Sequence, residues 1–333
     1  MGQDLDIVAI GDIVIDAFIR LKDKEAEVHC DENDEHCRLS MVFGDKIPYE
    51  SVTICPAVGN SPNAAVAATR LGLKVALVTN IGDDLNGKDC LASLKKDGVA
   101  TNFIKVNDGQ KTNYHYVLWY KDDRTILIKH EEYKYNLSDI GNPKWLYLSS
   151  LGEHSLDFHH EIGRYLESHR EIKLAFQPGT YQIRFGADKL TDIYAKTEIS
   201  FCNREEAQHI TKTEEEDILK LAEAMHRLGP KMVVITDGYN GAYAYANGEL
   251  WQMPIYPDPA PPVDRTGAGD AFASTVVAAL ALGKTLPEAL TWGPVNSMSV
   301  VQAVGAQAGL LNKEKINEYL AKAPENYKAQ KIN

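Results

Sequence analysis

The amino-acid sequence predicts an α/β fold built on a mostly parallel central sheet. Short apolar runs alternate with helical patterns along most of the chain, which is the order that gives a parallel sheet covered by helices on both faces. The chain has 333 residues, of which 44% are hydrophobic, enough for one large α/β domain or two ordinary ones. We expect a single domain over residues 1–333.

Six apolar runs are the predicted strands. They are Asp6–Ile10, Val75–Thr79, Trp145–Ser149, Lys173–Phe176, Ile199–Cys202 and Met232–Thr236. A hairpin is expected from Gly241–Tyr245 and Glu249–Met253, which are joined through an Asn-Gly turn.

The predicted helices follow these strands. The clearest has Ser61 as its cap and Pro62 in its first turn, and it stops at Gly72. A second begins at Asp270 and is closed by Gly283. Further helices are expected over Asn86–Lys96, Glu214–Leu228, Leu286–Val304 and Lys313–Ala321.

Two segments interrupt the alternation of strands and helices. Phe18–Thr53 is charged and irregular, while Thr112–His130 is rich in aromatic and β-branched residues and contains a polar turn. We expect the second segment to form a hairpin. Together the two segments, at about residues 18–53 and 112–130, are predicted to form a small β-sheet lid.

The overall charge limits the classes of partner. Thirty-five Lys and Arg against 47 Asp and Glu give a formal net charge of −12, which argues against nucleic acid or an anionic membrane as the main partner. The chain starts without a basic and apolar leader, and no stretch has the roughly 18 apolar residues of a membrane span. We therefore expect a soluble metabolic protein of the cytoplasm.

The most informative stretch is Pro262–Phe272, in which Gly267, Ala268 and Gly269 precede Asp270 at the start of a helix. Small residues let backbone N–H groups approach a phosphate closely. A helix N-terminus adds partial positive charge for a transferring phosphoryl group. Asp270 would lie beside that group as a proton acceptor.

The string Asp264-Arg-Thr-Gly-Ala-Gly-Asp270 resembles the carboxy-terminal motif of the ribokinase-like (PfkB) family of sugar and nucleoside kinases. The resemblance implies a three-layer α/β/α fold with a β-lid. It also implies that Gly267, Ala268 and Gly269 form an anion hole for the γ-phosphate and that Asp270 is the catalytic base.

Further stretches match the family in the same order along the chain. Asp12 and Asp16 follow the first strand, where the family holds substrate hydroxyls, and a carboxylate there can accept two hydroxyl hydrogen bonds. Gly59, Asn60 and Asn63 match the amino-terminal motif, with Asn60 in place of its second glycine. The resemblance assigns these five residues to the acceptor substrate, although ordinary strand-to-loop and helix-cap roles are also consistent with them.

Two short sequence elements match the family's binding site for the nucleotide and its Mg²⁺. Asn203 and Glu206 match an Asn-x-x-Glu element whose Glu organises water around Mg²⁺, while a simple helix cap would use the same residues. Thr236, Gly238 and Gly241 match the nucleotide loop at the end of a strand. No P-loop motif is present in the sequence.

Some positions depart from the family. Gln177-Pro-Gly-Thr180 replaces an Asp-Pro-Asn-like turn, and Pro294 stands where many members have an adenine-lining Asn or His, with Asn296 two residues later. Asp264, Thr266 and Gly305 match a monovalent-cation site, but Arg265 replaces the commoner Thr or Pro. The resemblance therefore implies ATP and Mg²⁺ and leaves K⁺ open.

The expected function is ATP-dependent phosphorylation of a hydroxyl of a small sugar. A nucleoside kinase, with lid aromatics such as Tyr114, Tyr116 or Trp119 stacked on a base, is the first alternative, and a sugar or nucleotide sensor without catalysis is the second. We also expect a homodimer joined through the lids.

One cluster lies outside these motifs. His29-Cys30 and His36-Cys37 flank an acidic turn. Three alternatives are open for it: a Zn²⁺ chelate, a Cys30–Cys37 disulfide, and a solvated acidic loop.

Overall fold

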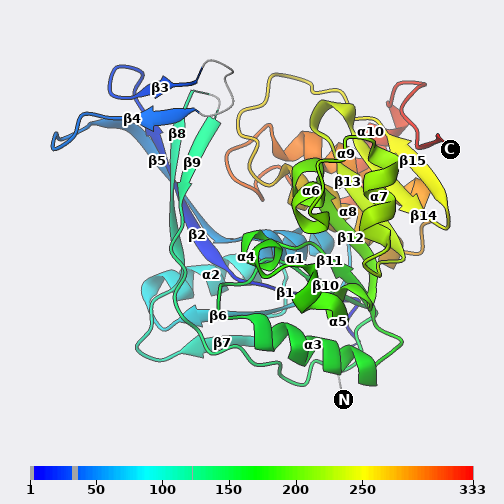
Figure 1. The fold of residues 1–333 in the computed structure, drawn as a ribbon. Helices are drawn as coiled ribbons and strands as arrows, with labels where there is room; N and C mark the ends of the chain where they lie inside the picture. The colour runs from blue at the N-terminus through cyan, green and yellow to red at the C-terminus, as the bar shows by residue number, and fades with distance from the viewer. Residues whose placement is uncertain (1–3, 32–36, 122, 333) are drawn as a thin grey trace.

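A ten-stranded sheet runs through the centre of the computed structural model, which describes residues 4–31, 37–121 and 123–332 (Figure 1). Its order is β16-β15-β14-β13-β12-β11-β10-β1-β6-β7. The seven strands from β7 to β13 pair in parallel, and the remaining pairs are antiparallel. The strands are β1 (Ile7–Ile10), β6 (Val75–Gly82), β7 (Ile104–Asn107), β10 (Trp145–Leu148), β11 (Lys173–Phe176), β12 (Thr197–Asn203), β13 (Met232–Thr236), β14 (Ala242–Ala246), β15 (Glu249–Met253) and β16 (Gln330–Lys331).

Helices cover both faces of this sheet, as expected from the sequence. Successive residues of β1 enter different cores, since Ile7 and Ala9 pack in one cluster while Val8 and Ile10 pack in the other. One cluster includes residues of α1 (Asn60–Arg70), α2 (Leu85–Lys96), α8 (Ala268–Ala281), α9 (Leu286–Val300) and α10 (Lys313–Ala321). The other includes residues of α3 (Leu156–Ser168), α5 (Thr191–Tyr194), α6 (Arg204–Thr211) and α7 (Ile218–His226), with α4 (Thr180–Phe185) beside it.

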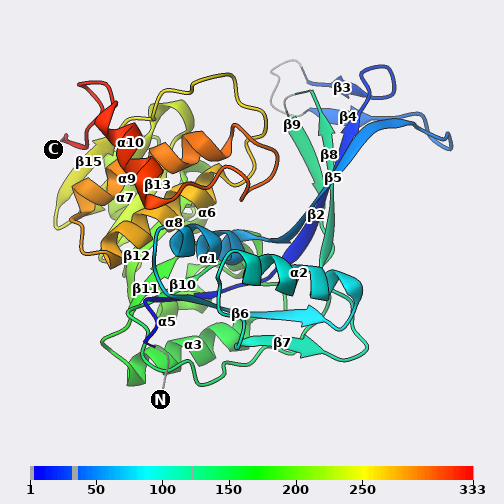
Figure 2. The same cartoon turned by 180° about the vertical axis from the view of Figure 1, so that it is seen from behind.

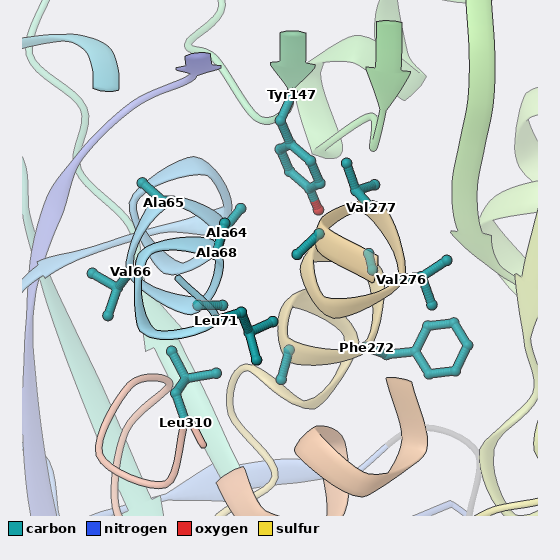
Figure 3. Packing of buried hydrophobic residues seen from close by; sticks show 14 of the residues in the cluster. Ala64, Ala65, Val66, Ala68, Leu71, Tyr147, Phe272, Val276, Val277 and Leu310 are labelled. Carbon is teal, nitrogen blue, oxygen red and sulfur yellow. The ribbon is translucent and has the colours of Figure 1, made fainter. Parts of the chain in front are cut away.

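The alanine-rich side of α1 packs directly against α8 (Figure 3). Ala64 and Ala68 are at most 4% exposed, and their small side chains, which point toward α8, allow the two helices to approach closely. This packing brings the N-terminal ends of α1 and α8 together, which matters for the site described below.

A second sheet projects from the main body (Figures 1 and 2). We call it the second sheet; its order is β5-β2-β8-β9. Its outer pairs are antiparallel and its central pair, β2 with β8, is parallel. The strands are β2 (Val14–Leu21), β5 (Tyr49–Val58), β8 (Tyr114–Tyr120) and β9 (Asp123–Leu127).

The predicted hairpin in Thr112–His130 is therefore present as β8 and β9, and Phe18–Thr53 contributes parts of β2 and β5. Two short strands within that segment, β3 (Glu27–His29) and β4 (Arg38–Ser40), pair only with each other. The aromatic residues of this hairpin do not share one face of the second sheet. Side chains alternate along a strand, so Tyr116 and Trp119 of β8 lie on opposite faces of the second sheet.

Several helix boundaries also differ from expectation. The helix predicted over 214–228 begins only at Ile218, because the Asp217 carboxylate accepts hydrogen bonds from the N–H groups of Leu219 and Lys220 and caps it there. The helix predicted over 286–304 ends at Val300. In the described part of the chain, none of the helices is long and apolar enough to cross a bilayer.

Candidate active site

The N-terminus of α8 begins at a glycine that no other residue could replace without strain. Gly267 has a φ of 81°, and a Cβ added to it would lie 2.3 Å from the Cβ of Ala306. A Cβ on Gly269 would meet no atom within 4 Å, so that position faces open space. The predicted small-residue turn therefore combines a tight internal contact with an open approach to the helix end.

Asp270, in the first turn of α8, is held by three side-chain amides. Asn60 Nδ2 and Gln177 Nε2 donate to its Oδ1 at 2.7 and 3.1 Å, and Asn63 Nδ2 donates to its Oδ2 at 2.8 Å. Asn60 and Asn63 are three residues apart on α1 and so share one face of the helix. We call Asn60, Asn63 and Gln177 the amide cradle.

The orientation of two cradle amides, those of Asn63 and Gln177, is fixed by their other partners. Gln307 Nε2 donates to Asn63 Oδ1 at 2.9 Å, and the Tyr147 hydroxyl donates to Gln177 Oε1 at 2.5 Å. Each oxygen is thus occupied, which leaves the NH₂ group to face Asp270.

Two opposing effects act on the Asp270 carboxyl. Burial raises its pKa, and the negative charge of Asp16 adds to the rise, while the hydrogen bonds from the amide cradle oppose it. The side chain is therefore an ionisable group that can accept a proton and that is stabilised as a carboxylate by neutral donors.

A cavity of about 310 Å³ opens beside Asp270. It brings together the sequence-predicted residues Asn60, Asn203, Glu206, Thr236, Gly267, Ala268, Gly269 and Asp270. Residues that sequence reasoning did not assign to a site also line it, notably Gln177, Arg265 and Arg124 of the second sheet. We call this cavity the phosphate cavity.

Asn203 and Glu206 form a reciprocal cap at the start of α6. Asn203 Oδ1 accepts from the Glu206 N–H at 2.8 Å, and Glu206 Oε2 accepts from the Asn203 N–H at 2.9 Å. The helix-cap interpretation is therefore correct, and both residues line the phosphate cavity as well. Burial raises the pKa of Glu206, and the charge of Asp270 raises it further.

A second cavity, of about 240 Å³, adjoins the first and shares Thr236, Arg265, Ala268, Gly269 and Phe272 with it. The predicted nucleotide-loop residues Gly238 and Gly241 line it, as does Pro294. Asn296 does not, because it is fully buried and bonded to Thr275 Oγ1 and to the Leu311 N–H. Apolar walls come from residues that the sequence did not indicate: Ile255, Tyr256, Met298 and Val301.

Asp12 lies just beyond the carboxyl end of β1, at the point where the strand order reverses. It is only 5% exposed. The Tyr135 hydroxyl lies 3.0 Å from both carboxylate oxygens, and His130 Nδ1 lies 3.1 Å from Oδ2. Sequence reasoning missed both partners, which come from a segment without regular secondary structure.

Asp16 lies four residues further, on β2 of the second sheet. His115 Nδ1 of β8 is 3.3 Å from its Oδ1. Among the described residues, neither Asp16 Oδ1 nor His115 Nε2 has a hydrogen-bond partner, although both atoms are buried. The His115 and His130 rings lie 5.2 Å apart, so two histidines and two carboxylates gather at the junction of the two sheets.

Gly59 connects this junction to α1. Its φ is 119°, and a Cβ there would lie 2.6 Å from the Asp12 carbonyl oxygen. The glycine therefore permits the close approach of two backbone segments that places Asp12 near the amide cradle.

The three residues predicted for a monovalent cation also meet. Asp264 Oδ1 accepts from the N–H and hydroxyl of Thr266, and its Oδ2 accepts from the Gly305 N–H at 2.9 Å. The carboxylate thus joins two loops whose backbone carbonyls remain the expected cation ligands.

The metal interpretation of the cysteine pairs is wrong for the sulfur atoms. Cys30 and Cys37 are joined in a disulfide, so neither sulfur is a thiolate ligand. His29 lies beside Glu27 on β3, and His36 falls outside the described residues. In the described segments, no group of three or more His, Cys, Asp or Glu side chains is arranged so that it could hold a metal ion.

Comparison with known proteins agrees with this geometry. The family model described as pfkB family carbohydrate kinase matches residues 6–313. Ribokinase of Bacillus subtilis is 29% identical over 306 residues, covering 86% of this chain and 97% of that protein. Cytidine kinase of Thermococcus kodakarensis is 29% identical over 253 residues, covering 74% of this chain and 88% of that protein.

Among solved structures, Arabidopsis thaliana ribokinase in complex with ribose and ATP superposes with a TM-score of 0.79 at 20% identity, covering 96% of this chain and 99% of that one. This likeness confirms the predicted three-layer fold. From the family match over nearly its whole length, this chain belongs to the pfkB family of carbohydrate kinases.

Proposed function

We propose that this carbohydrate kinase transfers the γ-phosphoryl group of ATP to a hydroxyl of a small sugar, with Asp270 as the proton acceptor. The observation that carries the proposal is the Asp270 carboxylate, held by three amide donors beside the open glycine turn of α8. A base in that place can take the hydroxyl proton as the P–O bond forms.

The proposed roles of the other residues follow from their places. The backbone N–H groups of Gly267, Ala268 and Gly269 would stabilise the transferring phosphoryl group at the helix end. Asp12 and Asp16 would accept hydrogen bonds from the acceptor hydroxyls, with the Gly59 turn and the cradle residues Asn60 and Asn63 setting the distance to Asp270. Catalysis would then depend mainly on positioning and on charge stabilisation.

Two carboxylates, Glu206 and Asp270, face the phosphate cavity, and the charge of Asp270 raises the pKa of Glu206. A divalent cation would relieve this repulsion, and the carboxylate fits Mg²⁺, which prefers oxygen ligands and keeps several waters. We propose that Glu206 holds Mg²⁺ through water, with Asn203 orienting Glu206. Bound Mg²⁺ would neutralise charge on the nucleotide phosphates.

The adjoining cavity is the proposed nucleotide site, with Thr236 at the phosphates and Gly238 and Gly241 beneath the ribose and base. The walls near Pro294 are apolar and suit an adenine ring.

We also propose K⁺ binding by backbone carbonyls of Asp264 and Thr266 and by the loop at Gly305. Activity in KCl should then exceed activity in NaCl at equal ionic strength.

The acceptor class is proposed as a neutral polyol. Asp12 and Asp16 repel anions, whereas hydroxyl groups can donate to both.

A nucleoside acceptor is supported by the His130 and Tyr181 rings, whose centroids lie 6.1 Å apart near Asp12. Tyr114 and Tyr116 are less suitable as base-stacking residues, since they project from the face of β8 opposite to His115. A binding protein without catalysis would need no residue in the position of Asp270.

We propose that the second sheet is a lid and also the interface of a homodimer. Ile54, Ala17, Tyr116 and Leu127 form one row across its four strands, and three of these side chains are about half exposed. Such an apolar row on a projecting sheet fits the same row of a second copy.

A cytoplasmic location fits an ATP-using kinase, but the Cys30–Cys37 disulfide is unusual for that compartment. Thiol alkylation of protein from intact cells would test the location.

The deciding experiment is an ADP-formation assay against ribose, fructose, other hexoses, sugar acids and nucleosides, with mass analysis of the product. A phosphorylated sugar is the expected result. Turnover of nucleosides alone would favour the alternative, and ADP formation that no acceptor raises above background would contradict both kinase assignments.

A further inference from the structure

We propose that a third cavity, on the face of the main sheet that carries α3, binds a small hydroxylated anion and thereby raises the affinity for the acceptor. The cavity has a volume of about 250 Å³, close to the 240 Å³ of the proposed nucleotide site. We call it the edge cavity, because β6 and β7 at the end of the sheet form its floor (Figure 1). Its effect on the acceptor rests on the proposed function, which places the acceptor at Asp12.

The floor of the edge cavity is one face of the last two strands. Asn80 of β6 pairs with Lys105 of β7, and residues directly opposite one another across strands share a face. Val78 and Phe103, each two residues earlier on its strand, lie on the same face and contribute to the core on that side. The floor therefore has an apolar inner part and a polar outer part.

The opposite wall includes residues 133–138, a segment without regular secondary structure that we call the covering segment. Its residues Tyr135, Asn136 and Ser138 line the edge cavity together with Phe158 of α3. The Tyr135 and Phe158 rings are stacked, with centroids 5.5 Å apart. Because the covering segment belongs to no helix or strand, a ligand between it and the sheet would add contacts that hold it in place.

The polar groups of the edge cavity are mainly donors. Asn80 is 7% exposed, and its Oδ1 accepts from Asn107 Nδ2 at 3.1 Å, which leaves its NH₂ group without an acceptor among the described residues. Lys105 Nζ donates to the Lys134 carbonyl and to Asn136 Oδ1, both at 3.2 Å. Both acceptors are neutral, and an ammonium has a third N–H to donate.

These donors define the chemistry of the ligand. Among the described residues that line the edge cavity, Lys105 is the only charged one, although the chain as a whole has a net charge of −12. It would attract one anionic group. Asn80, Asn102 and Ser138 can bond hydroxyl groups, and the Tyr135 ring offers an apolar surface to a carbon skeleton. A sugar phosphate or a sugar acid has this chemistry, in contrast to the neutral acceptor proposed above.

Tyr135 connects the edge cavity to the acceptor junction. Its hydroxyl lies 3.0 Å from both oxygens of Asp12 and accepts from the Gly152 N–H at 3.2 Å. A ligand that holds the covering segment against the sheet restricts the positions open to this hydroxyl and to the Asp12 carboxylate. The acceptor then binds an ordered carboxylate, which lowers the entropic cost of its binding. By linkage, the acceptor raises the affinity for the anion by the same factor.

The first test is calorimetry of the whole protein with glucose 6-phosphate, gluconate and glucose. MgADP is present to occupy the phosphate cavity, and each titration is repeated with the best acceptor. Lys105→Met removes the charge of the edge cavity, and Asn102→Asp adds a negative charge at its exposed rim. Lys88→Met and Asn326→Asp are the matched controls, since these exposed residues do not line the cavity.

We expect glucose 6-phosphate, gluconate or both to bind with a Kd of about 1 mM or lower, within the usual range for enzyme ligands. Glucose should bind at least about tenfold more weakly. Lys105→Met and Asn102→Asp should each weaken the anion by at least about tenfold, as for the loss of a hydrogen bond to a charged group. The two controls should stay within about twofold. The anion that binds more tightly distinguishes a phosphate ligand from a carboxylate ligand.

The second test measures the connection to the acceptor. At a saturating concentration of the anion, acceptor KM should fall by about fivefold, the lower end of usual coupling. Amide exchange over residues 133–138 should slow at the same time. Tyr135→Phe keeps the stacked ring but lacks the hydroxyl, so it should still bind the anion while its acceptor KM no longer responds.

The inference would be overturned if neither anion bound at about 10 mM, if glucose bound as tightly as the anions, or if Lys88→Met lost as much affinity as Lys105→Met. An acceptor KM that stays constant with bound anion, or that still falls in Tyr135→Phe, would contradict the route through Tyr135. The proposed function fails separately, if the unsubstituted protein phosphorylates no acceptor while the difference in anion binding between Lys105→Met and Lys88→Met remains.

Discussion

The phosphate cavity and the junction of the two sheets, where Asp12 and Asp16 lie, are built in different ways, although a carboxylate lies at the centre of each. The phosphate side uses one continuous stretch, residues 264–270, whose glycines expose backbone N–H groups at the start of α8. The acceptor side is assembled from side chains of separate segments, with Tyr135 and His130 on Asp12 and His115 beside Asp16. In the proposed function, phosphoryl transfer would therefore rely on these backbone groups and on Asp270, while acceptor choice would depend on side chains from separate segments.

The largest expected effect tests the phosphate side. Asp270→Asn should lower kcat by at least about 10²-fold, the lower range for losing a general base, with little change in the Kd of ATP. Asparagine is nearly isosteric but cannot take up the hydroxyl proton. Steady-state kinetics with a verified acceptor, together with ATP calorimetry, would check this. A variant with normal kcat would remove Asp270 from the mechanism.

The acceptor side should respond differently. Asp12→Ala removes the partner of both His130 and Tyr135, and we expect acceptor KM to rise by about tenfold or more, as for the loss of a hydrogen bond to a charged group. The Kd of ATP should stay within about twofold of the original value. Loss of ATP affinity with unchanged acceptor KM would contradict the division of the site into two regions.

Sequence motifs named several residues that line the phosphate cavity, because each motif is a short stretch with fixed local spacing. All six predicted strands are present, and the helix expected over Lys313–Ala321 has those bounds. Of the side chains that gather at the junction of the two sheets, only the two carboxylates were predicted from the sequence. Asp12 and Asp16 follow a strand, but His130 and Tyr135 lie in a segment without periodicity, and only the tertiary fold brings them to Asp12.

The helix α3 was missed although a signal was present. Phe158, Ile162 and Leu166 are spaced by four residues and are all buried on one face. Arg124 offered no such signal, because its position depends on the strand register and on how far the second sheet extends over the main body. The register within the β8–β9 hairpin follows from its short turn, but the pairing of β8 with β2 joins segments distant in sequence and cannot be read from a local pattern.

A substitution in the apolar row of the second sheet should leave the phosphate cavity intact, because that row is separate from the residues that line the cavity. Tyr116→Glu places a charge in the exposed apolar row, so the protein should sediment as a monomer at micromolar concentration where the unsubstituted protein sediments as a dimer. Amide exchange over β8 and β9 should slow when acceptor binds the unsubstituted protein. Both parts would be contradicted if the unsubstituted protein sedimented as a monomer and its amide exchange over β8 and β9 stayed unchanged with every substrate that it phosphorylates.

The smallest effect concerns the amide cradle, where the two regions meet. Burial raises the pKa of Asp270, and the cradle hydrogen bonds hold that rise in check. Only the ionised form accepts a proton, so activity should fall as the pH decreases through this raised pKa. Asn60→Gly removes the donor at 2.7 Å from Oδ1, which destabilises the carboxylate and raises the pKa further. The acid limb of the kcat/KM profile should therefore move to higher pH by about one unit, since a hydrogen bond to a charged group is worth about 1.4 kcal/mol or more.

Asn136→Gly is the matched control, because this exposed amide bonds Lys105 and makes no contact with Asp270. A limb that stays in place in Asn60→Gly, or that moves equally in Asn136→Gly, would show that the cradle does not set the ionisation of Asp270.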